Sequence, residues 1–477
     1  MNPLDASFLY LENGVTHMHV GSCAIFEGPT PPYDELLRAF GAKLPLVPRY
    51  RQRVRFVPFD LGRPVWVDDP HFNLEYHVRH SALPRPGTGA ELERLMGRVM
   101  SQELDRNRPL WEAWVVEGLE GGKWALISKV HHCMIDGVSG VDLVMVMLDQ
   151  TREPTPPAMD DWDPEPEPSS LRLAADAVSS LLTSPREQAR AVRSVLRQPR
   201  EALRRARVLT TGLHNFGTAL RPTPPTTVDG SIGPHRRWTS ARTTLDDVRA
   251  VRQAFGGTVN DVVLTAIASG LRDLILSRDE DPSEVTLRSL VPVSMRSADA
   301  HGVYDNRVSA IFFDLPVDIA DPIERLAAVR AEMARLKESH EPEAGEVLTS
   351  LAGTFPALTA QATRLAVRLM TRMPQRSMNT VTTNVPGPPM ALYAGGREML
   401  EYLPFVPLGP GVRVGVAILS YHGGISFGVT GDFDTVPDVQ VVGRGIERAM
   451  VELVRLADGE PDETIDLTAT RSTEGVA

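Results

Sequence analysis

The sequence predicts an α/β protein whose two halves each contain a β-sheet with packed helices. The chain has 477 residues, and a single hydrophobic core stops growing at roughly 250–300 residues. Each half mixes strand-like apolar runs with segments of helical spacing. A stretch rich in Pro, Asp and Glu at 151–170 separates the halves. We therefore expect an N-terminal subdomain at 1–150, a connector with a basic helical region at 151–228, and a C-terminal subdomain at 229–477.

The composition favours a folded protein that acts on something other than nucleic acid. Hydrophobic residues make up 42% and charged residues 23% of the chain, both close to globular averages. The net charge of −11 disfavours nucleic acid as a partner. The two cysteines, Cys23 and Cys133, form no CxxC pair, so neither a disulfide framework nor a zinc site is expected. These features predict a cytoplasmic protein.

No membrane-spanning or secretory segment is expected. The chain has no run of 18 uninterrupted apolar residues, the length that a membrane span requires. Its first residues, MNPLDASFLYLENG, lack a basic stretch followed by an apolar run. Contact with lipid is therefore expected to be peripheral, at the inner membrane or at lipid droplets.

The first half is predicted to alternate strands and helices. Leu36, Leu37, Phe40 and Leu44 follow helical spacing, and the turn Glu120-Gly121-Gly122 separates two apolar runs that form a plausible hairpin. The expected elements are a strand at 18–26, helices at 33–44 and 89–104, and strands at 111–116 and 124–132.

The region after the connector is basic and helical. Residues 171–220 carry helical patterning interrupted by Pro185 and Pro199. The arginines of its second part are Arg186, Arg190, Arg193, Arg197, Arg200, Arg204, Arg205 and Arg207. They indicate either a solvated helix face or a surface that attracts anionic lipid head groups, with leucines on another face.

The second half is predicted to contain another sheet with helices. Its expected helices lie at 245–255, 260–276, 322–337 and 436–456. Its expected strands lie at 287–293, 309–315, 379–385, 412–421 and 424–430.

One constellation carries the chemistry, the run from His131 to Gly137 with the sequence HHCMIDG. It follows a predicted strand and precedes a predicted helix at 138–148. Adjacent strand residues point to opposite faces, so one histidine faces a site while the other packs. A histidine with a pKa near 6.5 is largely neutral at cytoplasmic pH and suits a general base. Gly137 permits the turn before the helix.

The HHxxxDG pattern at a strand-to-helix junction resembles the signature of the superfamily that includes chloramphenicol acetyltransferase and condensation domains. Within it, the chain resembles the bacterial wax ester synthase/diacylglycerol acyltransferase family from about residue 5 to residue 456. Further matches in the right order are Pro3-Leu4-Asp5, Met18-His19-Val20-Gly21, Arg108-Pro109-Leu110-Trp111-Glu112, Asn260-Asp261, Val291-Pro292-Val293-Ser294-Met295-Arg296 and Asn384-Val385-Pro386-Gly387-Pro388.

The resemblance implies two chloramphenicol-acetyltransferase-like subdomains with an active-site tunnel at their interface. It implies that His132 is the general base, that His131 is orienting or structural, and that Asp136 forms an ion pair, for which Arg296 is our candidate. Asn260 and Asn384 are expected near the cleft as substrate-binding residues, although Asn260 also fits a helix cap. Backbone N–H groups at Gly137 and the following helix are candidate oxyanion donors.

Other interpretations of the same residues are less favoured. Alternation places Cys133 opposite His132, so a Cys-His dyad is implausible, and the diverging histidines leave no convergent metal ligands. His131 and Asp136 also fit the Hx4D spacing of membrane glycerolipid acyltransferases, but the downstream EGTR-like motif of that family is not in the sequence.

The expected reaction is transfer of a long-chain acyl group from acyl-CoA, as co-substrate, to diacylglycerol or a long-chain alcohol, with no resident cofactor and no metal. Two alternatives stay open: a condensation-type acyltransferase that uses a carrier thioester, and a catalytically weak lipid-binding protein with the same fold.

Overall fold

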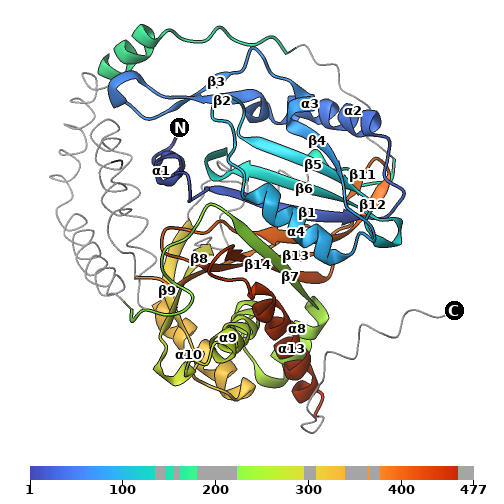
Figure 1. Ribbon diagram of the computed structural model, residues 1–477, viewed down its shortest axis with the longest axis vertical. Coiled ribbons are helices and arrows are strands. Elements are labelled where there is room, and N and C mark those ends of the chain that lie inside the picture. Colours follow the sequence, from blue (N-terminus) through green and yellow to red (C-terminus); the bar gives the residue numbers. More distant parts are fainter. Residues whose placement is uncertain are drawn as a thin grey trace, which may run out of the picture.

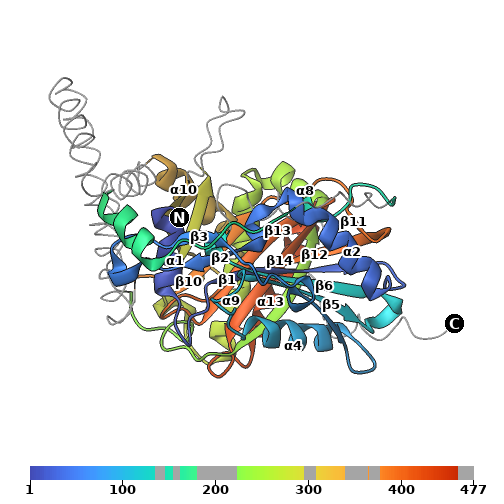
Figure 2. The same cartoon turned by 90° about the horizontal axis from the view of Figure 1, so that it is seen from above.

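Two six-stranded sheets form the centre of the molecule in the computed structural model (Figure 1). The structure describes residues 1–134, 146–153, 162–179, 223–294, 308–338, 364 and 377–459. The sheets lie next to each other, and helices of the second half cover the outer face of the second sheet (Figures 1 and 2). Both halves therefore have the predicted sheet-and-helix composition.

The first sheet has the strand order β11-β12-β1-β6-β5-β4. Its strands are β1 (His19–Phe26), β4 (Val78–Ala82), β5 (Trp111–Glu117), β6 (Trp124–His131), β11 (Tyr393–Ala394) and β12 (Arg397–Phe405). The predicted hairpin is confirmed, because β5 and β6 pair antiparallel with Trp111 opposite Val130. On its other side β6 pairs antiparallel with β1 along the whole of that strand.

Two strands of the first sheet come from the second half of the chain. Strand β12 pairs antiparallel with β1, with Gly21 opposite Phe405, and β11 pairs with β12. The first sheet is therefore completed by residues that follow the second sheet's strand β10 in the sequence.

Within the described residues, four helices and a small hairpin lie next to the first sheet. They are α1 (Pro3–Leu11), α2 (Tyr33–Lys43), α3 (Leu74–His77), α4 (Gly89–Met100) and the paired strands β2 (Gln52–Arg55) and β3 (Val65–Asp68). Helix α4 begins with a capping box formed by Thr88 and Glu91. Its buried residues include Leu92, Leu95, Met96 and Val99, a helical spacing that directs one face into the core. The helix ends before the predicted limit at residue 104.

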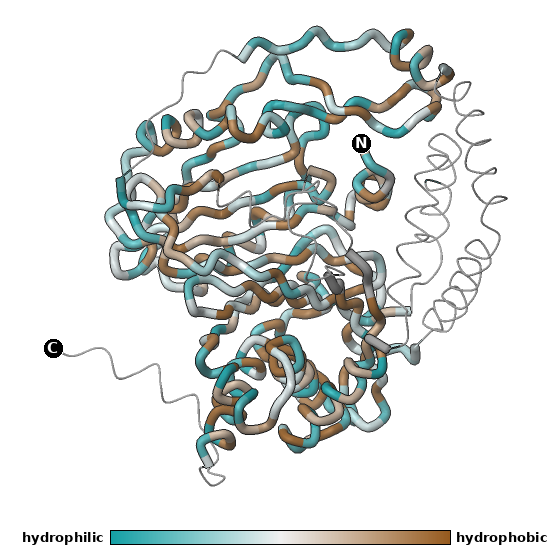
Figure 3. The backbone as a smooth tube through the Cα atoms, turned by 180° about the vertical axis from the view of Figure 1, so that it is seen from behind, coloured by the Kyte–Doolittle hydropathy of each residue, from teal (hydrophilic) through white to brown (hydrophobic). Residues whose placement is uncertain are grey.

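The second sheet has the order β7-β14-β13-β10-β8-β9. Its strands are β7 (Arg236–Thr244), β8 (Leu287–Ser294), β9 (Val308–Leu315), β10 (Thr380–Val385), β13 (Val414–Tyr421) and β14 (Gly424–Asp432). The helices packed on it are α8 (Leu245–Phe255), α9 (Val259–Ser277), α10 (Pro322–Glu338) and α13 (Val439–Ala457). Hydrophobic residues run through these strands and helices (Figure 3). The bounds of the four helices agree with the predicted ones within a few residues, so these predictions are confirmed.

Helix α9 starts differently from the sequence interpretation. The capping residue is Thr258, whose side chain accepts from the backbone N–H of Asp261, while Asp261 accepts from the N–H of Thr258. This is a capping box. Asn260 therefore lies inside the first turn, and the interpretation of Asn260 as the cap was wrong.

The two sheets are in close contact where β12 and β14 meet. A Cβ atom added at Gly428 would lie 1.7 Å from the carbonyl oxygen of Pro404. The indole N–H of Trp238, on β7, donates to the same oxygen at 3.1 Å. Nearby, the backbone N–H of Arg236 donates to the hydroxyl of Ser101 at the end of α4. The halves are thus joined by backbone contact and buried hydrogen bonds.

Among the described residues, no helix combines the length and the apolar character needed to cross a bilayer.

Candidate active site

The two motif histidines occupy different environments at the end of β6. His131 is the last residue of the strand and is fully buried. His132 begins a short 3-10 turn (His132–Met134) and is partly exposed. The backbone N–H of His132 donates to the carbonyl of Met18 at 2.8 Å, which holds the start of this turn beside β1. His131 is fully enclosed in the core, whereas His132 is largely buried and keeps part of its side chain exposed.

The ring of His132 stacks on Phe8 of helix α1. The ring centroids are 3.9 Å apart and the planes differ by 24°. Burial lowers the pKa of His132 to about 4, although a hydrogen bond with its own backbone raises it somewhat. The imidazole is therefore neutral at pH 7. A neutral imidazole has one nitrogen without a proton, and that nitrogen can accept one.

The two ring nitrogens of His131 face different groups. The backbone N–H of Cys133 donates to Nδ1 at 3.1 Å, so Nδ1 carries no proton. The neutral ring then has its proton on Nε2, and Nε2 lies 3.5 Å from a carboxylate oxygen of Glu12. That distance is longer than a normal hydrogen bond, and Nε2 has no hydrogen-bond partner among the described residues, so the contact is electrostatic. His131 therefore contacts the turn through one nitrogen and helix α1 through the other.

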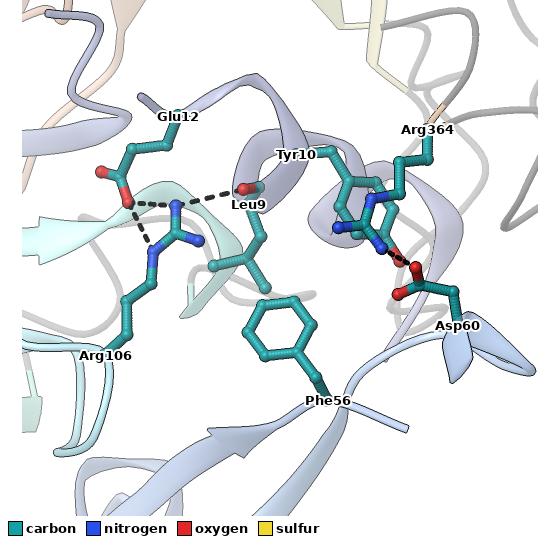
Figure 4. Close-up of a pocket in the computed structure, with 7 residues that line it drawn as sticks. All are labelled: Leu9, Tyr10, Glu12, Phe56, Asp60, Arg106 and Arg364. Carbon is teal, nitrogen blue, oxygen red and sulfur yellow. Dashed lines mark hydrogen bonds and ion pairs between the residues drawn. The ribbon is translucent and has the colours of Figure 1, made fainter. Parts of the chain in front are cut away.

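Glu12 is the centre of a buried polar cluster. Its Oε2 accepts from Nε and Nη2 of Arg106 at 3.1 and 2.8 Å (Figure 4). Its Oε1 accepts from the backbone N–H of Met18 at 3.2 Å. Burial alone would raise the pKa of Glu12, but its contacts with His131 and Arg106 lower it to about 2. The side chain is thus a carboxylate at every pH near neutrality.

Glu12 and Arg106 also line a cavity of about 450 Å³. Glu12 and Arg106 form one wall, and an ion pair between Asp60 and Arg364 forms another (Figure 4). The remaining lining residues are Leu9, Tyr10 and Phe56. Both arginines in the cavity are paired with carboxylates, so its walls present apolar surface together with neutralised charge.

Three predicted site residues, Asp136, Gly137 and Arg296, lie outside the described residues, as do the candidate oxyanion donors at Gly137 and the following helix. The structure does bring Asn260 and Asn384 together, with the amide of Asn384 donating to the side-chain oxygen of Asn260 at 3.4 Å. Within the described part of the chain, no hydrogen bond, ion pair or ring contact links this pair to His132.

Cys133 lies in the core next to the histidines, and burial raises the pKa of its thiol well above the normal value. Among the residues that the structure describes, no group of three or more His, Cys, Asp or Glu side chains could hold a metal ion.

Sequence reasoning missed the roles of three residues. Phe8 contacts His132, Glu12 contacts His131, and Arg106 contacts Glu12. Phe8 and Glu12 lie four positions apart, the spacing that places side chains on one face of a helix. That signal is visible only once residues 3–11 are known to be helical.

Two mixed sheets and a histidine pair at a strand end define a chloramphenicol-acetyltransferase-like fold. The first condensation domain of the calcium-dependent antibiotic synthetase shares it, with a TM-score of 0.58 at 17% identity over 95% of this chain and 94% of that one. The chain belongs to the wax ester synthase/diacylglycerol acyltransferase family. The model of that family's catalytic domain matches residues 1–263, and the model of its C-terminal domain matches residues 304–454.

Individual relatives agree with this assignment. The chain is 37% identical over 459 residues to the probable diacylglycerol O-acyltransferase tgs1 of Mycobacterium tuberculosis, covering 96% of both chains. It superposes on the wax ester synthase/diacylglycerol acyltransferase of Marinobacter aquaeolei VT8 with a TM-score of 0.68 and 29% identity, covering 96% of this chain and 99% of that one. The predicted family and fold are therefore confirmed, and the protein is an acyltransferase.

Proposed function

We propose that the protein transfers a long-chain acyl group from acyl-CoA to the hydroxyl of diacylglycerol or of a long-chain alcohol, with His132 as the general base. The observation that carries this proposal is the state of His132. It is a neutral imidazole at a strand end, held by Phe8 and by its own backbone, in a chain whose family makes wax esters and triacylglycerols. A neutral imidazole is the form that accepts a proton.

The proposed reaction is a direct transfer. The free nitrogen of His132 removes the proton from the acceptor hydroxyl while the oxygen attacks the thioester carbonyl. The carbon–sulfur bond then breaks, and the imidazolium gives its proton to the departing thiolate, which yields the ester and free CoA. Each step uses only the imidazole and the two substrates, so the chemistry calls for no acyl-enzyme.

The low pKa of His132 suits the second half of this cycle. An imidazolium whose pKa is about 4 is a stronger acid than an ordinary one with a pKa near 6.5, and a thiol has a pKa near 8.5. Proton transfer to the thiolate is therefore strongly downhill. The same low pKa makes His132 a weaker base, which is compatible with a role that removes the hydroxyl proton only as the new bond forms.

Peripheral contact with a lipid surface is the second part of the proposal, because both the acceptor and the product are apolar. Phe59, in the loop between β2 and β3, is 89% exposed, and Leu171, in a helix over residues 170–179, is 81% exposed. The two segments are neighbours, since a Cβ added at Gly62 would lie 3.6 Å from Ala177. We place this contact at the cytoplasmic face of the membrane or on lipid droplets. Sedimentation with phospholipid vesicles, compared with a Phe59→Ser variant, tests it.

The reaction is tested with purified protein and palmitoyl-CoA in three arms: diacylglycerol, hexadecanol, and no acceptor. We expect CoA release that depends on an acceptor and is matched by triacylglycerol or wax ester. Equal CoA release in all three arms would indicate a thioesterase and refute the transferase assignment. Binding of palmitoyl-CoA without release in any arm would indicate a lipid-binding protein instead.

A further inference from the structure

Helix α1 contacts both histidines of the motif. It begins at the Asn2 cap, whose side chain accepts from the N–H of Asp5 at 2.7 Å, and ends at Glu12, whose N–H donates to the carbonyl of Phe8 at 3.1 Å. Phe8 and Glu12 lie one helical turn apart on the same face. Phe8 stacks on the ring of His132, and Glu12 faces the ring of His131. The helix is thus placed to determine how the histidine pair is presented.

The hydrogen bond from Cys133 to His131 depends on the position of one proton. It forms only while Nδ1 is unprotonated. A neutral imidazole with its proton on Nδ1, or a doubly protonated ring, would turn an N–H toward the N–H of Cys133, and two donors repel each other. Cys133 is the second residue of the turn that starts at His132. The proton position on His131 therefore decides whether this turn is anchored to the core.

The carboxylate of Glu12 favours the required proton position. It lies 3.5 Å from Nε2, and a carboxylate has only acceptor atoms, so an N–H at Nε2 is stabilised and a bare nitrogen is not. Glu12 is itself fixed by Arg106 and by the N–H of Met18. Its side chain is only 6% exposed, so water does not replace this contact.

We propose that Glu12 is a positioning residue, which acts through His131 to hold the turn that presents His132 to the acceptor hydroxyl. The proposal rests on His132 being the base. Glu12 itself touches neither substrate in this account. In other enzymes a buried carboxylate orients the catalytic histidine directly. Here the carboxylate of Glu12 orients His131, which in turn holds the turn that carries His132.

The first test replaces the carboxylate of Glu12. Glu12→Ala removes the side-chain group, and Glu12→Gln removes the negative charge while keeping the shape of the side chain. Because every partner of Glu12 is a donor, the amide group of the glutamine must face one of them. We expect kcat to fall about 10- to 100-fold, the loss typical when a partner that orients a metal-binding histidine is removed, with little change in KM. The matched control is Glu117→Gln. Glu117 also faces a histidine, His80, with their side-chain atoms 2.7 Å apart, but this pair is exposed, so the kcat of this variant should be unchanged.

The second test asks whether the effect passes through His131. In His131→Asn, the side-chain oxygen can take the place of Nδ1 and accept from Cys133 without any tautomer to be set. In that background, Glu12→Gln should change kcat by less than about 3-fold, so the two substitutions should be clearly non-additive. Thermal unfolding of each variant shows whether it is folded, and Glu12→Gln carries the test if Glu12→Ala is not.

The outcomes separate this inference from the proposed function. Equal losses of kcat from Glu12→Gln in both backgrounds would mean that Glu12 acts through Arg106 or Met18, and the inference would be overturned. Unchanged kcat with a raised KM would mean that Glu12 acts on substrate binding from the cavity wall that it lines, and would also overturn the inference. If His132→Ala is inactive while Glu12→Gln is fully active, only the inference fails; if His132→Ala is active, the proposed function fails.

Discussion

The stacking of Phe8 on His132 leads to a quantitative prediction about pH. Burial lowers the pKa of His132 to about 4, against about 6.5 for an exposed histidine. At pH 5.5, about 97% of a base with a pKa of 4 is neutral, compared with about 9% of a base with a pKa of 6.5. The native enzyme should therefore keep nearly all of its kcat/KM at pH 5.5. Phe8→Ala admits water to the ring and should lose up to about tenfold between pH 7.5 and pH 5.5.

The assay is triacylglycerol formation from labelled palmitoyl-CoA at pH 5–8, since kcat/KM reports the pKa values of the free enzyme. The control is Phe433→Ala, which removes an exposed ring that meets His235 edge-on at 6.1 Å; its profile should match the native one. Thermal unfolding at each pH shows that the variants stay folded. A native acid limb centred near pH 6.5, or identical profiles for Phe8→Ala and the native enzyme, would refute the reasoning.

Three further predictions concern stability and reactivity. Gly428→Ala places a Cβ atom 1.7 Å from the carbonyl oxygen of Pro404 and should lower the unfolding free energy by about 1–3 kcal/mol. The control is Gly89→Ala, whose added Cβ meets nothing within 4 Å and should leave the unfolding free energy unchanged. Equal denaturant midpoints for the two variants would contradict the packing described. Burial lowers the pKa of His77 to about 4, so this histidine takes up a proton near pH 6.5 only in the unfolded chain. The unfolding free energy should therefore fall as the pH drops from 6.5 toward 4. A constant melting temperature across that range would argue against it. Both cysteines are buried with raised pKa values, so a thiol reagent should label neither Cys23 nor Cys133 until denaturant is added, and rapid labelling of the native protein would show that the core is open.

The parts of the fold that local pattern determines could be predicted from the sequence. The apolar runs on either side of Gly121 and Gly122 form the β5–β6 hairpin, because adjacent strands with a short turn need only local information. Helix α8 has the predicted bounds because a capping box at Thr244 and a glycine at residue 256 mark its ends.

Non-local pairing could not be predicted in the same way. Strand β12 joins β1 across more than 370 residues, and no periodicity within residues 397–405 indicates which sheet it enters. Helix α1 was missed although Asn2 and Pro3 form a typical helix start. Its nine residues, PLDASFLYL, are apolar on nearly all sides, so they show no helical period.

The same limit applies to the active site. The HHxxxDG spacing is enough to nominate His132, because the motif lies within seven consecutive residues. Glu12 lies 119 positions before His131, and its role depends on three segments meeting: the end of α1, Met18 just before strand β1, and the end of strand β6. Sequence patterns within one element do not contain that information.

The central claim is that the imidazole of His132 moves the proton in acyl transfer. The most direct measurement is the turnover of purified His132→Ala with palmitoyl-CoA and the preferred acceptor, together with its thermal unfolding. The account predicts a protein that stays folded and loses about 10²- to 10⁴-fold in kcat. A folded variant with native turnover would contradict it.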